Sequence, residues 1–195
     1  MNVRRMVSGV VLTGLLVAGS ACDGGAAGRP GPAATGQGSP AAAAGHGSHT
    51  PAPESPPLRD GERFVTLSLP RAYTPAAPNG GTDEYRCFLV DPGLTGNAFL
   101  TGSRFLPQNA AVVHHAIFFR VMPAQVQIAR QVDADSAGEG WTCFGDAGIP
   151  GDAAWVAHWA PGVGETGLAA DLGYPMPAGS RLIMQVHYNL LGVPR

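Results

Sequence analysis

The stretch at residues 110–121, AAVVHHAIFFRV, places two adjacent histidines inside an otherwise apolar run of β-branched and aromatic residues. This length and composition predict a buried strand. Burial strips an imidazole of its hydration, so His114 and His115 need binding partners. On a flat strand, successive side chains point to opposite faces, and a bulge or twist is needed to bring both rings to one site. Without it, one histidine is a hydrogen-bonded core residue and the other faces water.

A second strand-like segment, residues 181–190 (RLIMQVHYNL), carries His187 near its end. Alternation places His187 on the more polar face of this strand, together with Ile183, Gln185 and Asn189, where a cleft is expected. If the two strands meet, three imidazoles converge. Three neutral nitrogen ligands without a nearby carboxylate disfavour calcium, magnesium and iron of the two-His-one-carboxylate kind, which leaves copper and zinc.

Other parts of the chain also read as strands separated by Gly/Pro turns, and no internal repeat is visible. Residues 122–135 have some helical character, but Pro123 and the polar, glycine-containing run that follows favour an irregular connection. Residues 162–173 are expected to form a loop and residues 174–179 a turn. The pattern predicts an all-β fold, an antiparallel β-sandwich of jelly-roll type. The expected strands besides the two with histidines are 63–69, 84–90 and 97–105 (broken at Gly102). Residues 141–145 are expected to return to the core, and residues 153–159 contribute most of the aromatic side chains of the second half.

Residues 1–21 have the three parts of a secretory signal peptide: two arginines, an apolar core too short for a comfortable membrane span, and small residues before Cys22. Residues 19–22 (GSAC) resemble a bacterial lipoprotein cleavage site, at which the cysteine becomes lipid-modified. Gly19 stands where leucine is usual, so an ordinary cleavage that gives a soluble secreted chain is the alternative. We expect export, with an anchor through Cys22 to the outer face of the cytoplasmic membrane or release by secretion.

Residues 22–60 consist largely of Ala, Gly, Pro and Ser and are expected to form a disordered tether. His46 and His49 lie in it, and their presence is best explained by composition. Residues 61–195 then form one domain, long enough for a real core. The formal net charge of −2 and only 12 Lys and Arg residues, without a basic cluster, exclude nucleic acid as the expected partner.

The three cysteines are expected to have different roles. Cys22 is used at the cleavage site, and in an exported protein Cys87 and Cys143 are most simply a disulfide, whose loop contains the whole histidine strand. The alternative is that a cysteine ligates copper, as in blue-copper sites, which also need a weak methionine ligand after the cysteine. Cys143 is followed by Phe-Gly-Asp-Ala, which does not support that alternative.

Several fragments, taken in order, resemble the N-terminal domain of copper type II, ascorbate-dependent monooxygenases, the family of peptidylglycine α-hydroxylating monooxygenase and dopamine β-monooxygenase. The match covers essentially all of residues 61–195, and its most specific feature is the His-His pair followed by Gln-Val-His-Tyr. The matching fragments are Tyr85-x-Cys87, Leu106-Pro107 before Val113-His114-His115, the Cys143 region, Trp159-Ala160-Pro161-Gly162, and Pro177-x-Gly179 before Met184-Gln185-Val186-His187-Tyr188.

The resemblance implies a jelly-roll-like sandwich in which His114, His115 and His187 bind the electron-transfer copper and Cys87 pairs with Cys143. In that family a second domain holds the oxygen-activating copper, and ascorbate supplies electrons. The chain departs from the family at Ala116, where the animal enzymes have methionine, and at Phe119-Arg120, where they have a further cysteine. The sequence stops at Arg195 without the second domain, so no catalytic residue is expected in it.

The leading hypothesis is therefore the copper-binding N-terminal domain of such a monooxygenase, which cycles with ascorbate or another electron donor but does not hydroxylate on its own. A copper-binding or copper-delivery lipoprotein without oxygenase activity is the second hypothesis, and a zinc-stabilised structural domain is the third. His158, between Trp155 and Trp159, is expected to be a hydrogen-bonded histidine packed among aromatic residues rather than a spare ligand.

Overall fold

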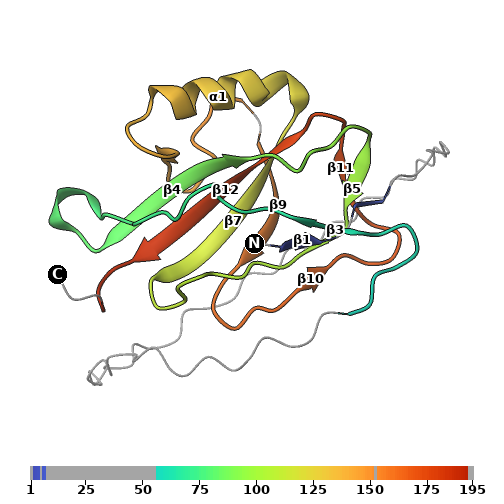
Figure 1. Cartoon of the computed structure of the whole chain (residues 1–195), viewed down its shortest axis with the longest axis horizontal. Coiled ribbons are helices and arrows are strands. Elements are labelled where there is room, and N and C mark those ends of the chain that lie inside the picture. Colours follow the sequence, from blue (N-terminus) through green and yellow to red (C-terminus); the bar gives the residue numbers. More distant parts are fainter. Residues whose placement is uncertain (1, 5, 8–55, 152, 193–195) are drawn as a thin grey trace, which may run out of the picture. The chain divides into compact units, whose positions relative to one another are not determined.

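The structure is a computed structural model that describes residues 2–4, 6–7, 56–151 and 153–192 (Figure 1). The chain divides into two units, and the first, residues 1–9 and 48–195, contains every described residue. Cys22, His46, His49 and most of the expected tether lie outside the described residues. Within the described part, no helix is both long and apolar enough to cross a membrane.

The fold is mostly β, as predicted, and its centre is a five-stranded antiparallel sheet. Strand β12 pairs along its length with β4 on one side and with β7 on the other, so the two histidine-bearing strands are direct neighbours (Figure 1). In spatial order the strands are β8 (Trp141–Thr142), β4 (Asp83–Val90), β12 (Arg181–Asn189), β7 (Val113–Val121) and β9 (Ala154–Trp159).

Smaller antiparallel pairings accompany the main sheet. Strand β11 (Tyr174–Met176) pairs with β5 (Ala98–Leu100), which also pairs with β2 (Met6–Val7). The other two pairs are β1 (Asn2–Arg4) with β3 (Phe64–Thr66), and β6 (Gly102–Ser103) with β10 (Thr166–Gly167). Strands β1 and β2 fall within the range predicted as a signal peptide. The 3-10 turn η1 (Pro78–Gly80) precedes β4.

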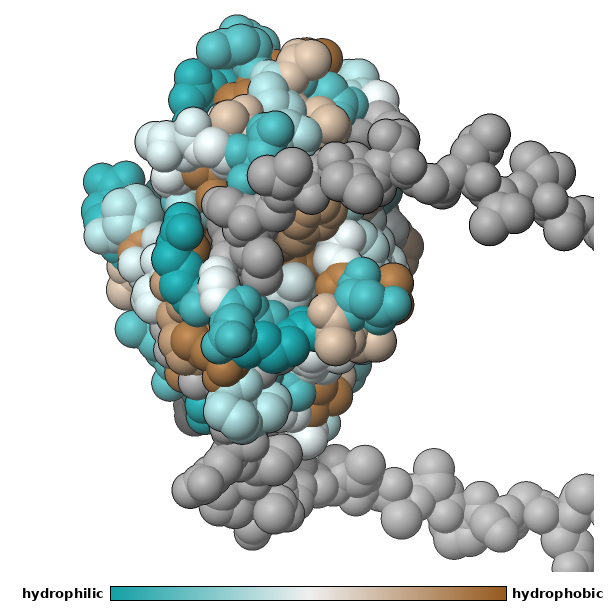
Figure 2. All heavy atoms as spheres, turned by 90° about the vertical axis from the view of Figure 1, so that its right-hand side faces the viewer, coloured by the Kyte–Doolittle hydropathy of each residue, from teal (hydrophilic) through white to brown (hydrophobic). Residues whose placement is uncertain are grey.

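Alternation along the central strands produces two hydrophobic clusters, one on each face of the main sheet. Leu182, Met184 and Val186 of β12 belong to the larger cluster, whereas Ile183 belongs to the smaller one. The smaller cluster also contains the Cys87–Cys143 disulfide, which confirms the predicted bridge, with a Cα–Cα distance of 5.9 Å. On the surface that Figure 2 shows, hydrophilic and hydrophobic residues lie side by side.

The irregular connection expected at residues 122–135 is wrong. This segment forms the 3-10 turn η2 (Pro123–Gln125) and the helix α1 (Val126–Asp135). Proline is tolerated at the start of a helical segment, where its missing N–H would have no partner. Val126 and Ala129 lie one turn apart and are buried in the smaller cluster, so α1 covers part of that face of the sheet.

Two loop predictions also need correction. The expected turn at residues 174–179 begins with strand β11, where Pro175 is tolerated because β11 is an edge strand. The expected loop at residues 162–173 contains β10. It runs so close to Gly102 that a Cβ on this glycine would lie 2.7 Å from the carbonyl oxygen of Thr166. This close backbone approach is the reason for a glycine at that position.

Candidate metal centre

The pairing of β7 with β12 places His115 directly opposite His187. Directly opposed residues of an antiparallel pair point to the same face, so these two imidazoles meet without any further adjustment. They lie on the face of the smaller cluster, because Ile117 and Ile183, two and four positions further into the sheet, belong to it. The strand topology alone therefore brings the first two ligands together.

A β-bulge brings in His114. Tyr188 pairs with Val113 and His187 pairs with His115, so the register shifts and His114 is the extra residue on β7. A bulge places two residues of one strand opposite one residue of its neighbour and turns the extra side chain. The side chain of His114 consequently joins that of His115 instead of pointing to the opposite face, and the predicted need for a bulge is confirmed.

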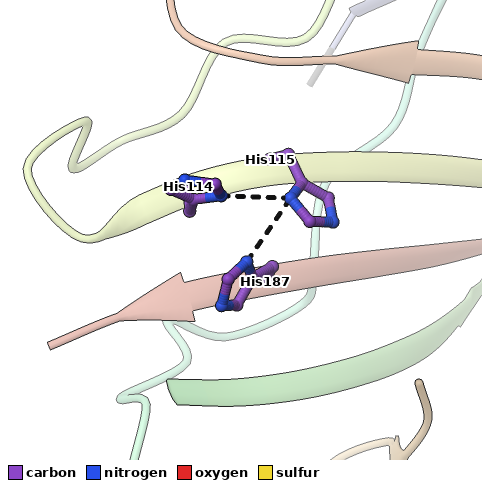
Figure 3. A group of neighbouring side chains, drawn as sticks. All are labelled: His114, His115 and His187. Atoms are coloured by element: carbon purple, nitrogen blue, oxygen red, sulfur yellow. Dashed lines mark hydrogen bonds between the residues drawn. The ribbon is translucent and has the colours of Figure 1, made fainter. Parts of the chain in front are cut away.

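The three rings point toward one another, as Figure 3 shows. The Nδ1 atom of His115 lies 3.2 Å from Nδ1 of His114 and 3.4 Å from Nδ1 of His187. One ligand nitrogen from each ring can be chosen so that all three lie within 4.8 Å of one another. His114 is exposed, His115 half-buried and His187 buried, so the group is open on the side of His114.

These distances fit a bound metal ion. Imidazole nitrogens bind zinc at about 2.0–2.1 Å, so two of them at tetrahedral or trigonal angles lie about 3.3–3.6 Å apart. The two Nδ1–Nδ1 distances, 3.2 and 3.4 Å, are close to that spacing. A proton on His115 Nδ1 could satisfy only one neighbour at a time, whereas a cation would accept a lone pair from every ring. The three histidines thus form a group that can hold a metal ion.

The protonation equilibria of His115 and His187 favour the binding of a metal ion. Burial lowers the pKa of His115 below its ordinary value, and the neighbouring His187 and His114 lower it further. Burial also lowers the pKa of His187, an effect that the hydrogen bond to Asp83 partly opposes. Because metal ions bind neutral imidazole, lowered pKa values keep these two rings available as ligands around neutral pH.

Two residues on β4 complete the surroundings of His187. Tyr85 pairs with His187, and the two rings stack with centroids 4.1 Å apart and planes 8° from parallel. The exposed Phe144 in turn meets the Tyr85 ring edge-on at 4.7 Å. Two positions before Tyr85, at the start of β4, a carboxylate oxygen of Asp83 lies 2.8 Å from Nε2 of His187. The hydrogen bond from Thr82, and then that from His187, lowers the pKa of Asp83.

The disulfide holds the loop after β8 beside this part of the sheet. The backbone N–H of Cys143 donates to the carbonyl oxygen of Tyr85 at 3.3 Å. Gln185, next to His187 on the same face of β12, is buried and donates to the carbonyl oxygen of Asp146 at 2.6 Å. These contacts link Tyr85 and β12 to the bridged loop, which supports the strand from which His187 projects.

Other sequence features do not join the site. His158 lies opposite Ile117 on β9, is exposed, and has its ring centroid 6.0 Å from that of Trp155; it is not part of the histidine group. A cavity of about 500 Å³ is lined by Met184, Val186 and Tyr188. These side chains point to the face opposite His187, so this cavity is not the cleft expected beside the histidine.

No family model matches the chain, and a search of curated proteins finds no match.

Proposed function

We propose that this chain is a copper-binding module whose His114, His115 and His187 hold one redox-active copper ion. The observation that carries the proposal is the grouping of the three rings: Nδ1 of His115 lies 3.2 and 3.4 Å from Nδ1 of His114 and His187, and one ligand nitrogen from each ring lies within 4.8 Å of the others. Bound there, copper would supply one-electron chemistry between Cu(I) and Cu(II). The chain itself binds the ion, orients the three rings, and keeps two of them neutral through burial.

Copper is favoured over a structural zinc ion by the form of the site. Structural zinc is held by four protein ligands in a closed tetrahedron. Here the group found among the described residues offers three histidines, and His114 leaves it open to solvent. A three-imidazole site with an open side suits an ion that exchanges electrons with a partner, and neutral imidazole is a good ligand for copper.

The specific role that we propose is that of the electron-transfer copper domain of an ascorbate-dependent copper monooxygenase. The support is the sequence resemblance, together with a site in which the resembling residues are neighbours on β7 and β12. In this role the chain accepts electrons from ascorbate or another donor and passes them to an oxygen-activating copper domain. The coding sequence beyond Arg195 tests this directly, since a following domain with further copper ligands is expected.

We further propose that the chain is exported and anchored through a lipid on Cys22. A disulfide at Cys87–Cys143 is typical of oxidising compartments outside the cytoplasm, which supports export. Metabolic labelling with a fatty-acid analogue should mark the wild-type chain but not a Cys22→Ala variant. Labelling of both chains, or of neither, would contradict the lipid anchor.

Copper titration of the full chain tests the central proposal. We expect one Cu(II) per chain with nitrogen hyperfine structure in the electron paramagnetic resonance spectrum, and loss of that signal when ascorbate is added. His158→Ala serves as the matched control, because this exposed histidine lies outside the group and should leave binding unchanged. Tight binding of zinc without uptake of copper would refute the proposal.

Copper delivery without oxygenase chemistry is the second candidate, and the exposure of His114 favours it because a ligand at the surface eases release of the ion. The two functions differ in what happens to bound Cu(I). A delivery protein hands Cu(I) to an acceptor chain, whereas an electron-transfer domain retains copper while electrons pass through it. Mixing the loaded chain with a copper-free acceptor of higher affinity and separating the two measures retention or transfer.

A further inference from the structure

The carboxylate of Asp83, at the start of β4, takes part in three hydrogen bonds. Its Oδ1 atom lies 2.8 Å from Nε2 of His187 and accepts from Nδ2 of Asn189 at 2.9 Å. Its Oδ2 atom accepts from the hydroxyl of Thr82 at 2.8 Å. Asp83 pairs with Asn189, while His187 pairs with Tyr85, so Asp83 reaches the imidazole along the diagonal of the same sheet face.

This contact determines which nitrogen of His187 carries a proton. An ionised carboxylate only accepts hydrogen bonds, so the Nε2 atom beside it must be the protonated one. A neutral imidazole has a single N–H, which leaves a lone pair on Nδ1. Nδ1 is the atom that lies 3.4 Å from Nδ1 of His115, at the centre of the histidine group. The carboxylate therefore selects the tautomer that a metal ion requires.

We propose that Asp83 is a positioning residue for the metal, holding His187 in the Nε2–H tautomer with Nδ1 directed at the metal-binding point. This role rests on the metal site proposed above. It is specific to one ligand, because the described residues place no carboxylate within hydrogen-bond distance of His114 or His115. The stacked ring of Tyr85 restrains the plane of the same imidazole, so His187 is the most firmly oriented of the three ligands.

A purely structural role makes a different prediction. Asp83 also ties β4 to β12 through Asn189, and this contact would persist whatever the tautomer of His187. In that case, removal of the carboxylate would alter stability but leave the ring and its metal affinity unchanged. The tautomer of His187 and the metal affinity of the folded chain are therefore the two quantities that separate the roles.

Two substitutions separate the hydrogen bond from the charge. Asp83→Asn keeps a carbonyl oxygen facing His187 and Asn189, and its amide can donate to the hydroxyl of Thr82, so every partner stays satisfied. Asp83→Ala removes both the acceptor and the charge. Asp171→Ala is the matched control, since it removes an exposed carboxylate from the loop before β11.

The experiment reads tautomers by long-range ¹H–¹⁵N correlation in the metal-free full chain at mildly alkaline pH, where imidazoles are neutral, and then measures copper affinity by competition. We expect the Nε2–H form of His187 in the wild type and in Asp83→Asn, and a mixture in Asp83→Ala. Copper affinity should fall about 10–100-fold in Asp83→Ala, less in Asp83→Asn, and not at all in Asp171→Ala.

The outcomes also separate this inference from the proposed function. An Nδ1–H form of His187 in the wild type, or equal copper affinity in the wild type and in Asp83→Ala, would overturn the positioning role alone. A folded wild-type chain that takes up no metal would overturn both. Circular dichroism of each variant confirms that the chains compared are folded.

Discussion

Reduction of the Cys87–Cys143 bridge should lower the free energy of unfolding by about 4 kcal/mol. The two cysteines are 56 positions apart, and the loop between them contains all of β5, β6, β7, α1 and β8. Cross-linking a loop of this length restricts the unfolded chain, and the chain-entropy relation gives about 4 kcal/mol. This is a large share of the roughly 5–15 kcal/mol that stabilises an ordinary domain.

The assay is urea unfolding of the metal-free chain with and without a reductant, followed by tryptophan fluorescence. Comparing the oxidised and reduced forms of the same chain isolates the covalent link. A Cys87→Ala/Cys143→Ala variant should be less stable still, because both cysteines are buried and the variant also loses their sulfur atoms from the core. Below its transition, the reduced chain should still bind metal, since the three ligands come from β7 and β12.

A loss of less than about 1 kcal/mol on reduction would refute the reasoning, because the restriction of the unfolded chain is then not the source of stability. Loss of metal binding by a reduced chain that is still folded would refute the prediction that the histidine group binds metal without the bridge. That result would mean that the bridge shapes the histidine group directly rather than supporting the sheet around it.

Three further predictions follow from individual residues. Alanine in place of any one of the three site histidines should lower copper affinity by more than the roughly 10–100-fold that is typical when a residue hydrogen-bonded to a metal ligand is lost. His158→Ala should leave copper affinity unchanged. Calorimetric titration measures both, and equal affinities of the wild type and a site-histidine variant would contradict the prediction. In denaturant unfolding, Gly140→Ala should cost about 1–3 kcal/mol more than Gly93→Ala. Both glycines have φ +67, but a Cβ at Gly140 would collide with the carbonyl oxygen of Cys87, whereas a Cβ at Gly93 would meet no atom within 4 Å. Burial, and then nearby Glu84, raises the pKa of Tyr188 from 10.0 to about 12, so the stability it contributes is complete below about pH 10 and is lost as pH rises toward 12. Tyr188→Phe should remove a transition near pH 12 from the tyrosinate absorbance titration, and identical titrations would contradict this.

The histidine group could be predicted from the sequence because its signals are local. The apolar, β-branched composition of residues 110–121 and 181–190 indicates two strands, and buried imidazoles demand partners. The position of the bulge could not be predicted, because hydrophobic alternation does not say which residue of a strand is the extra one. The pairing of His187 with His115 and of Tyr188 with Val113 supplied that information.

The contact of Asp83 with His187 and the helix α1 could not be predicted from the sequence, for different reasons. Asp83 lies 104 positions from His187, and only the register of β4 against β12 brings the carboxylate to the ring. The predicted strand, 84–90, begins one residue after Asp83, whereas β4 begins at Asp83 and so places this residue on the same face as Tyr85. In α1 only Val126 and Ala129 are buried, which is too short an apolar stripe to reveal a helix by periodicity.

The bulge at His114 has a genetic consequence. Val113 and His115 already pair with consecutive residues of β12, so the ladder would be continuous without the residue between them. Deletion of a single in-frame codon would therefore leave a regular strand and a complete sheet, but only two of the three ligands. Conversely, one histidine codon inserted beside a strand histidine that already faces a histidine on the neighbouring strand is enough to create this arrangement. The metal site and the plain sheet are one mutational step apart, and a chain with His114 deleted should fold while losing high-affinity copper binding.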